Sequence, residues 1–127
     1  MLCHSSREKP VSSRLSRSAR SWLTGALSLA GQRKVVLSDT GNFPTDLYVA
    51  QMAIRALGKD HELKLVAPDD VGGAIDETVA VLMLTQIDYR TGRLHDMQAL
   101  TAKARENGVV TIWDLAHSAG AVTVDLA

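Results

Sequence analysis

Residues 109–120, Val109-Val110-Thr111-Ile112-Trp113-Asp114-Leu115-Ala116-His117-Ser118-Ala119-Gly120, decide the fold of this 127-residue chain. Their apolar start predicts a buried strand, and Asp114 follows at the carboxyl end of that strand. Open α/β sheets bind ligands in the crevice at this end of their strands. His117 lies three residues beyond Asp114, close enough to face the same crevice.

The rest of the chain alternates predicted strands with predicted helices. The run Val79–Leu84 is apolar throughout, which is typical of a strand buried on both faces of a parallel sheet. Further strands are expected at Lys34–Asp39 and Leu63–Val66, helices at 21–29, at 44–57 and from 97 to a stop at Gly108, and one helical turn within 68–78. This order predicts an α/β fold with a parallel sheet and right-handed crossovers.

Composition and charge exclude several classes of protein. Hydrophobic residues make up 46% of the chain, and the formal net charge is zero. A nucleic-acid surface is not expected, because it needs clustered basic residues on a folded face. The one cysteine, Cys3, cannot form an internal disulfide, so nothing requires an oxidising compartment. No apolar run reaches the ~18–20 residues of a membrane span, and we expect a cytoplasmic protein.

The first 20 residues differ from the remainder. They hold five basic residues and one acid, together with many serines, and show no sustained periodicity. We interpret residues 1–20 as a disordered or unrelated basic leader, with a weak likeness to an organelle transit peptide.

The segment Phe43-Pro44-Thr45-Asp46 stands where a strand passes into a helix. Pro44 suits the first helical position, and Asp46 suits the positive end of the helix dipole, so both have roles that need no ligand. Phe43 could instead lie over an aromatic ligand, with Thr45 and Asp46 as polar contacts. The residues alone leave both interpretations open.

Asp114 and His117 are the strongest candidates for chemistry. Asp114 could pair with a cationic nitrogen of a ligand or cap the following loop. His117 could stack on a flat ligand, donate a hydrogen bond, transfer a proton, or bond only to the backbone. Two potential ligands make a weak case for a metal ion, and we expect none.

A second polar segment, Asp88-Tyr89-Arg90-Thr91-Gly92, follows the buried strand. Tyr89 and Arg90 could touch a substrate carboxylate or phosphate, although a solvated turn explains the segment equally simply. His95 and Asp96 are interpreted as cap residues of the next helix.

Three segments together resemble kynureninase, a pyridoxal-phosphate enzyme of the aspartate-aminotransferase fold type (fold type I). They are Ser38-Asp39-Thr40-Gly41-Asn42-Phe43-Pro44-Thr45-Asp46-Leu47-Tyr48, then Leu84-Thr85-Gln86-Ile87-Asp88-Tyr89-Arg90-Thr91-Gly92 with His95-Asp96-Met97, then Trp113-Asp114-Leu115-Ala116-His117-Ser118-Ala119-Gly120. The resemblance covers about Trp22 to Leu126. It implies that residues 21–127 are part of the cofactor-binding large domain.

The resemblance also implies a site and a reaction. Pyridoxal 5'-phosphate would be the cofactor, with Asp114 on its pyridine nitrogen, Phe43 stacked on the ring and His117 beside it. The cofactor-binding residues would be Phe43, Pro44, Thr45, Asp46, Asp114 and His117. The substrate would be L-kynurenine or 3-hydroxykynurenine, cleaved to anthranilate or 3-hydroxyanthranilate and L-alanine in tryptophan catabolism and NAD biosynthesis. Full-length relatives would be homodimers.

The family's Schiff-base lysine follows its aspartate by roughly two dozen residues, preceded by a tyrosine. The five lysines of this chain are Lys9, Lys34, Lys59, Lys64 and Lys103, and none stands there. We therefore expect a partial chain that contains no catalytic residue of its own and does not turn over kynurenine alone.

Two rival interpretations stay open at this point. One is another fold-type I enzyme, such as a cysteine desulfurase-like protein, although the Phe43-Pro44-Thr45-Asp46 run argues against it. The other is a non-catalytic remnant or a small α/β binding module, which would be indifferent to pyridoxal phosphate.

Overall fold

A parallel β-sheet forms the centre of the structure, a computed structural model that describes residues 21–58 and 60–118. Its strands are β1 (Val35–Asp39), β2 (Glu62–Val66), β3 (Val79–Thr85) and β4 (Val110–Asp114), in the spatial order β2-β1-β3-β4. Each neighbouring pair runs parallel. The prediction of an α/β fold with a parallel sheet is therefore confirmed. The leader at 1–20 and the segment 119–127 lie outside the described residues.

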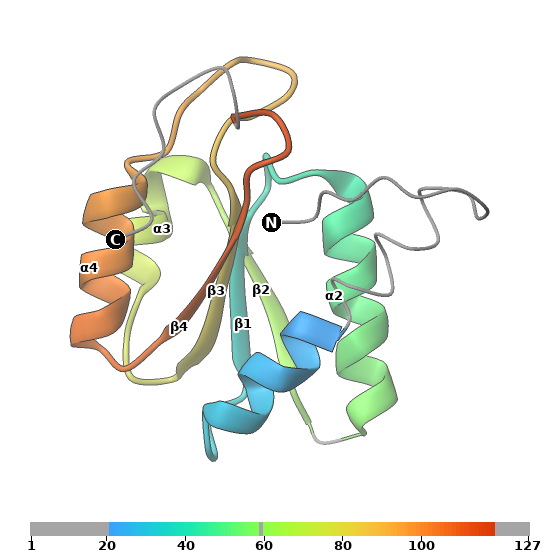
Figure 1. Ribbon diagram of the computed structural model, residues 1–127. Helices are drawn as coiled ribbons and strands as arrows, with labels where there is room; N and C mark the ends of the chain where they lie inside the picture. The colour runs from blue at the N-terminus through green and yellow to red at the C-terminus, as the bar shows by residue number, and fades with distance from the viewer. Residues whose placement is uncertain (1–20, 59, 119–127) are drawn as a thin grey trace.

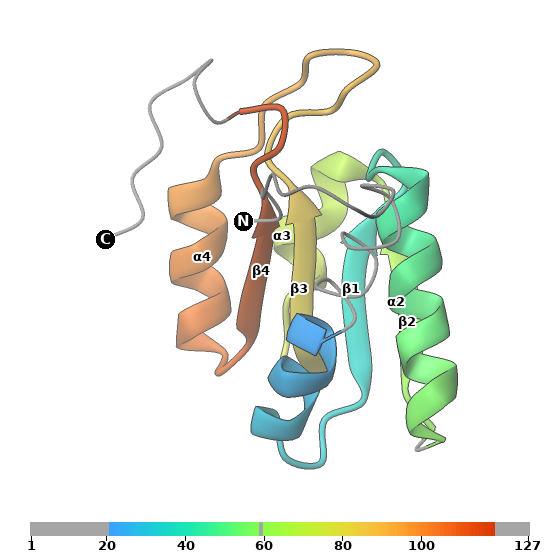
Figure 2. The same cartoon turned by 45° about the vertical axis from the view of Figure 1, so that its right-hand side comes forward.

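Helices cover both faces of this sheet (Figures 1 and 2). The helical residues 21–29 and α2 (Pro44–Leu57) lie on one face, while α3 (Val71–Ala74) and α4 (Met97–Glu106) lie on the other. A short 3₁₀ turn, η1 (Pro68–Asp70), leads into α3. The predicted helices, including the single turn between β2 and β3, are all present. Within the described residues, no helix is long and apolar enough to cross a membrane.

The core forms two apolar layers, one on each face of the sheet. β3 is the shared centre, since all seven of its residues are buried. Val36, Val81 and Met83 pack toward α2, whereas Leu82 and Leu84 pack on the opposite side with the face that α4 covers. Burial on both faces explains why the sequence of β3 is a continuous apolar run without the alternation of a half-exposed strand.

The helix ends follow their sequence signals. Pro44 occupies the first turn of α2, and the helix ends at Gly58, whose φ of 59° lies in the left-handed region that glycine adopts readily. Asp96 caps α4 by accepting a hydrogen bond from the Ala99 amide at 2.9 Å.

Candidate functional site

The carboxyl ends of β1, β3 and β4 bring three segments together. The turn after β1 leads into α2, the segment after β3 leads to α4, and the chain beyond β4 continues through His117. Because the strands are parallel and adjacent, residues far apart in the sequence meet at this edge. The three segments are those that carry the candidate residues.

Asp46 and Asp114 form the centre of the candidate site. Their side chains are hydrogen-bonded to each other, and burial together with the charge of Asp114 raises the pKa of Asp46 to about 7. Asp114 also accepts a hydrogen bond from the Ala116 amide at 2.8 Å, which confirms the interpretation of Asp114 as a cap of the following loop. At neutral pH about half of the Asp46 carboxyl groups therefore carry a proton. Such a pair favours a cationic N–H placed against it.

The raised pKa of Asp46 predicts how stability depends on pH. The folded chain binds this proton more tightly than the unfolded chain, in which the pKa is 3.8. The stabilisation is therefore fully present below pH 4 and is lost as the pH rises to about 7. We expect Asp46→Asn to remove this loss and to raise the free energy of unfolding at pH 8 by about 1–2 kcal/mol, since the partly exposed site screens the effect.

Urea unfolding of wild type and Asp46→Asn between pH 5 and pH 8 measures this difference. Glu106→Gln, which removes an exposed carboxylate on α4, is the matched control and is expected to follow the wild type. Parallel pH profiles for wild type and Asp46→Asn would contradict the assignment of the raised pKa to Asp46.

Three rings lie beside the carboxyl pair. The ring of Phe43 is 4.9 Å from that of Tyr89 in an edge-to-face contact, and 6.0 Å from that of His117. The ring centres of Tyr89 and His117 lie 6.3 Å apart, with an angle of 30° between the ring planes. The guanidinium of Arg90 lies 5.5 Å from the Tyr89 ring centre. The structure therefore brings Phe43, Tyr89 and His117 into one aromatic cluster, next to Asp46 and Asp114.

The segment after β3 forms the turn that its sequence allowed, while a substrate contact by Tyr89 and Arg90 stays a prediction. Asp88 accepts a hydrogen bond from the Arg90 amide at 2.8 Å, as expected of a turn. Tyr89 nevertheless contacts Phe43. Pro44 and Thr45 are both exposed in the first turn of α2, at the margin of the cluster.

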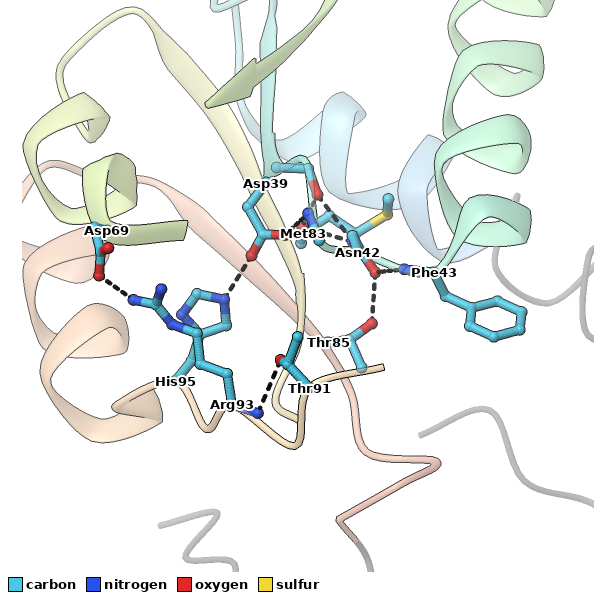
Figure 3. Close-up of polar contacts among 11 residues, drawn as sticks. Asp39, Asn42, Phe43, Asp69, Met83, Thr85, Thr91, Arg93 and His95 are labelled. Atoms are coloured by element: carbon cyan, nitrogen blue, oxygen red, sulfur yellow. Dashed lines mark hydrogen bonds and ion pairs between the residues drawn. The ribbon is translucent and has the colours of Figure 1, made fainter. Parts of the chain in front are cut away.

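Asn42 forms a buried hub beneath Phe43 (Figure 3). Its side-chain Nδ2 donates to Ser38 Oγ at 2.9 Å and to the Met83 carbonyl at 3.3 Å. Its Oδ1 accepts from the Phe43 amide at 2.7 Å and from Thr85 Oγ1 at 2.5 Å. One side chain thus ties the turn that carries Phe43 to the ends of β1 and β3. No local pattern in the sequence predicted this role of Asn42.

His95 is not a cap residue, contrary to the prediction. It is buried, and its Nε2 donates to Oδ2 of Asp39 at 2.5 Å. The other oxygen of Asp39 accepts from the Gly41 amide at 2.7 Å. Figure 3 shows this pair on the side of the sheet away from Phe43. Asp39, like Asp114, stands at the carboxyl end of a strand, which marks it as a candidate site residue. The sequence around His95 shows no pattern that predicts its burial or its bond to Asp39.

A tight approach explains the glycine in the same turn. A Cβ on Gly41 would lie 2.9 Å from Oδ2 of Asp88 and 3.3 Å from Oδ1 of Asp39. A small hollow opens beside it, lined in part by Thr85, Arg93 and His95. No group of three or more His, Cys, Asp or Glu side chains suited to a metal ion occurs among the described residues.

The amino-acid sequence of this chain is similar to those of several kynureninases. The chain is 55% identical to Deinococcus radiodurans kynureninase over 104 residues, 53% identical to Pseudomonas fluorescens kynureninase over 96, and 51% identical to Burkholderia mallei kynureninase over 98. These matches take in 82%, 75% and 76% of this chain. The chain spans about a quarter of the length of these relatives. No family model matches it.

Several solved structures share this fold at low sequence identity. The cystine C-S lyase C-DES, solved with glycine linked to its pyridoxal-phosphate cofactor, superposes with a TM-score of 0.63 at 18% identity, covering 81% of this chain and 31% of that one. A glycine decarboxylase superposes at 0.61, with 18% identity and coverage of 77% and 22%. The cysteine desulfurase CsdA of Escherichia coli superposes at 0.56, with 14% identity and coverage of 94% and 39%.

The comparisons decide between the interpretations of the sequence. Identities of 51–55% to kynureninases make this chain homologous to a segment of that enzyme. The parallel sheet with helices on both faces is part of a fold-type I domain. The rival interpretations, a cysteine desulfurase-like protein and a non-catalytic remnant or small α/β binding module, are not favoured, because the identity to kynureninases is 51–55% whereas the desulfurase is only 14% identical to this chain.

Proposed function

We propose that this chain, homologous to a segment of kynureninase, forms the part of that enzyme that binds the pyridine ring of pyridoxal 5'-phosphate. The observation that carries the proposal is the hydrogen-bonded pair of Asp46 and Asp114 beside an aromatic cluster. Identity to three kynureninases supports it.

The donor set fits a protonated, flat, aromatic ring. The Asp114 carboxylate presents an acceptor to a pyridinium N–H, and a charge pair about 4 Å apart is worth roughly 4 kcal/mol at an effective dielectric near 20. The raised pKa of Asp46 marks a repulsion that a cation would relieve. Phe43 and His117 offer ring faces and edges to a planar ligand.

Each candidate residue then has a role of its own. Asp114 would bind the pyridine nitrogen and keep it protonated, and Asp46 would support this charge from the first turn of α2. Phe43 and His117 would contact the ring, and Pro44 and Thr45 would contribute from the start of the same helix. Bound pyridoxal phosphate supplies an electron-withdrawing ring that stabilises negative charge on a substrate carbon.

The reaction proposed for the whole enzyme is hydrolysis of L-kynurenine. Water cleaves the Cβ–Cγ bond, so that Cγ leaves in the carboxylate of anthranilate and Cβ gains a proton in L-alanine. 3-Hydroxykynurenine would give 3-hydroxyanthranilate in the same way. A homodimer in the cytoplasm, acting in tryptophan catabolism and NAD biosynthesis, belongs to the same proposal.

A chimera tests this function. In it, the homologous segment of this chain replaces the matched 104 residues of Deinococcus radiodurans kynureninase. We expect the chimera to bind pyridoxal phosphate and to release anthranilate from L-kynurenine. The fluorescence of anthranilate measures this release. The 127 residues alone are expected to release no anthranilate. Lys34 directly precedes β1, Lys64 lies in β2 and Lys103 lies in α4, so none of these three lysines lies at the candidate site.

Two outcomes would contradict the proposal. A folded chimera that binds pyridoxal phosphate but is inert toward kynurenine and 3-hydroxykynurenine would overturn the substrate assignment. Anthranilate release by the isolated chain, above a blank without protein, would overturn its predicted inactivity.

A further inference from the structure

We propose that His95 is a positioning residue, which sets the spacing between the turn that carries Phe43 and Asp46 and the strand end that carries Asp114. This inference concerns the geometry of the chain itself. Its consequence for the cofactor rests on the proposed function.

The side chain of His95 holds one half of the site. Its Nε2 bonds to Asp39 at 2.5 Å, and the same carboxylate holds the Gly41 amide at 2.7 Å. Gly41 lies in the turn that leads directly into Phe43 and α2. Only 9% of the His95 side chain and 4% of the Asp39 side chain are exposed, so water competes little for this bond.

The backbone of His95 holds the other half. Its amide donates to the Gln86 carbonyl at 2.9 Å, and the Gln86 amide donates to the Asp114 carbonyl at 3.1 Å. The His95 ring also lies edge-on to the ring of Trp113, the residue before Asp114, at 6.4 Å. A continuous chain of hydrogen bonds thus runs from Gly41 through His95 to the end of β4.

This arrangement differs from an ordinary structural ion pair. An exposed pair in the same segment, Arg93 with Asp69, joins the segment to η1 and reaches no candidate residue. The pair of His95 and Asp39 instead joins the end of β1, which leads into the turn before Asp46, to the segment whose backbone is bonded to the end of β4. Loss of its side-chain bond should therefore let Asp46 and Asp114 move apart, even where the fold persists.

The matched variants are His95→Gln and His95→Asn. Glutamine can place its amide nitrogen where Nε2 stands, whereas asparagine is one methylene too short to reach Asp39. Arg93→Gln is the control, because it breaks an ion pair of the same segment. The primary readout is the pKa of Asp46, which is measured by NMR in the full chain without cofactor. This readout does not depend on the proposed function.

We expect the pKa of Asp46 to stay near 7 in wild type, His95→Gln and Arg93→Gln, and to fall toward 3.8 in His95→Asn. In the chimera, the affinity for pyridoxal phosphate should fall about tenfold or more in His95→Asn and less than about threefold in the other two variants.

An unchanged Asp46 pKa in a folded His95→Asn variant would overturn the inference. If His95→Asn loses its native near-ultraviolet circular dichroism, Asp39→Asn takes its place, because it keeps an oxygen for the Gly41 amide and removes the charge that His95 binds. An unchanged Asp46 pKa there would overturn it equally. A wild-type chimera that binds no pyridoxal phosphate would defeat the proposed function alone, since the Asp46 titration still decides the role of His95.

Discussion

In the chimera, Asp114→Ala is expected to lower the affinity for pyridoxal phosphate by about 10–100-fold, because a hydrogen bond to a charged group contributes about 1.5–3 kcal/mol. Anthranilate release should fall by about a hundredfold or more, since the unprotonated ring is a weaker acceptor of electrons. Cofactor binding is measured by absorbance titration, and activity by anthranilate fluorescence at saturating cofactor. The two measurements separate lost binding from lost chemistry.

Asp114→Asn tests whether charge or shape carries the effect. The amide keeps the size of the side chain and an oxygen for the Ala116 amide, but it removes the negative charge. We expect it to behave like Asp114→Ala, and to lower the pKa of Asp46 because the repelling charge is gone. Glu106→Gln serves as the control. Wild-type affinity in Asp114→Asn would refute the role of Asp114 as partner of the pyridine nitrogen.

Much of the fold could be predicted because its signals are local. The apolar run Val79–Leu84 lies in the buried strand β3. Helix α2 begins at Pro44 and ends before Gly58, as expected. Asp114 lies at the carboxyl end of a strand, as its place after an apolar stretch indicated. These features depend on residues within a few positions of one another, and the order of elements then leaves few topologies open.

The support of the site could not be predicted in the same way. Asp39 and His95 are 56 positions apart, and no periodicity links them. The hydrogen bonds of Asn42 to Met83 and Thr85 span 41 and 43 positions. His95 stands directly before the true cap, Asp96, so the local pattern favoured the wrong role. Assignment of cofactor roles to Phe43 and His117 stays a prediction, although the structure brings their rings together.

The largest loss of stability from a polar substitution is expected at Asn42. Asn42→Ala removes the acceptor of the Phe43 amide and of the Thr85 hydroxyl, both close to the buried Asn42 side chain. Each polar group left without a partner costs about 1–3 kcal/mol, so we expect the free energy of unfolding to fall by about 2–4 kcal/mol. Urea unfolding of the full chain, with an unchanged slope, measures this loss.

Asn107→Ala is the matched control for this prediction. The Asn107 side chain donates one exposed hydrogen bond to the Lys103 carbonyl at 2.9 Å, and its loss should cost about 0.5–1 kcal/mol. Equal losses for the two asparagines would show that water replaces the partners of Asn42, and the hub would then not hold Phe43. We expect a larger loss in Asn42→Ala than in Asn107→Ala, together with a weakened near-ultraviolet signal from the aromatic cluster. This result would show that the Asn42 side chain both stabilises this edge of the sheet and orients the ring of Phe43.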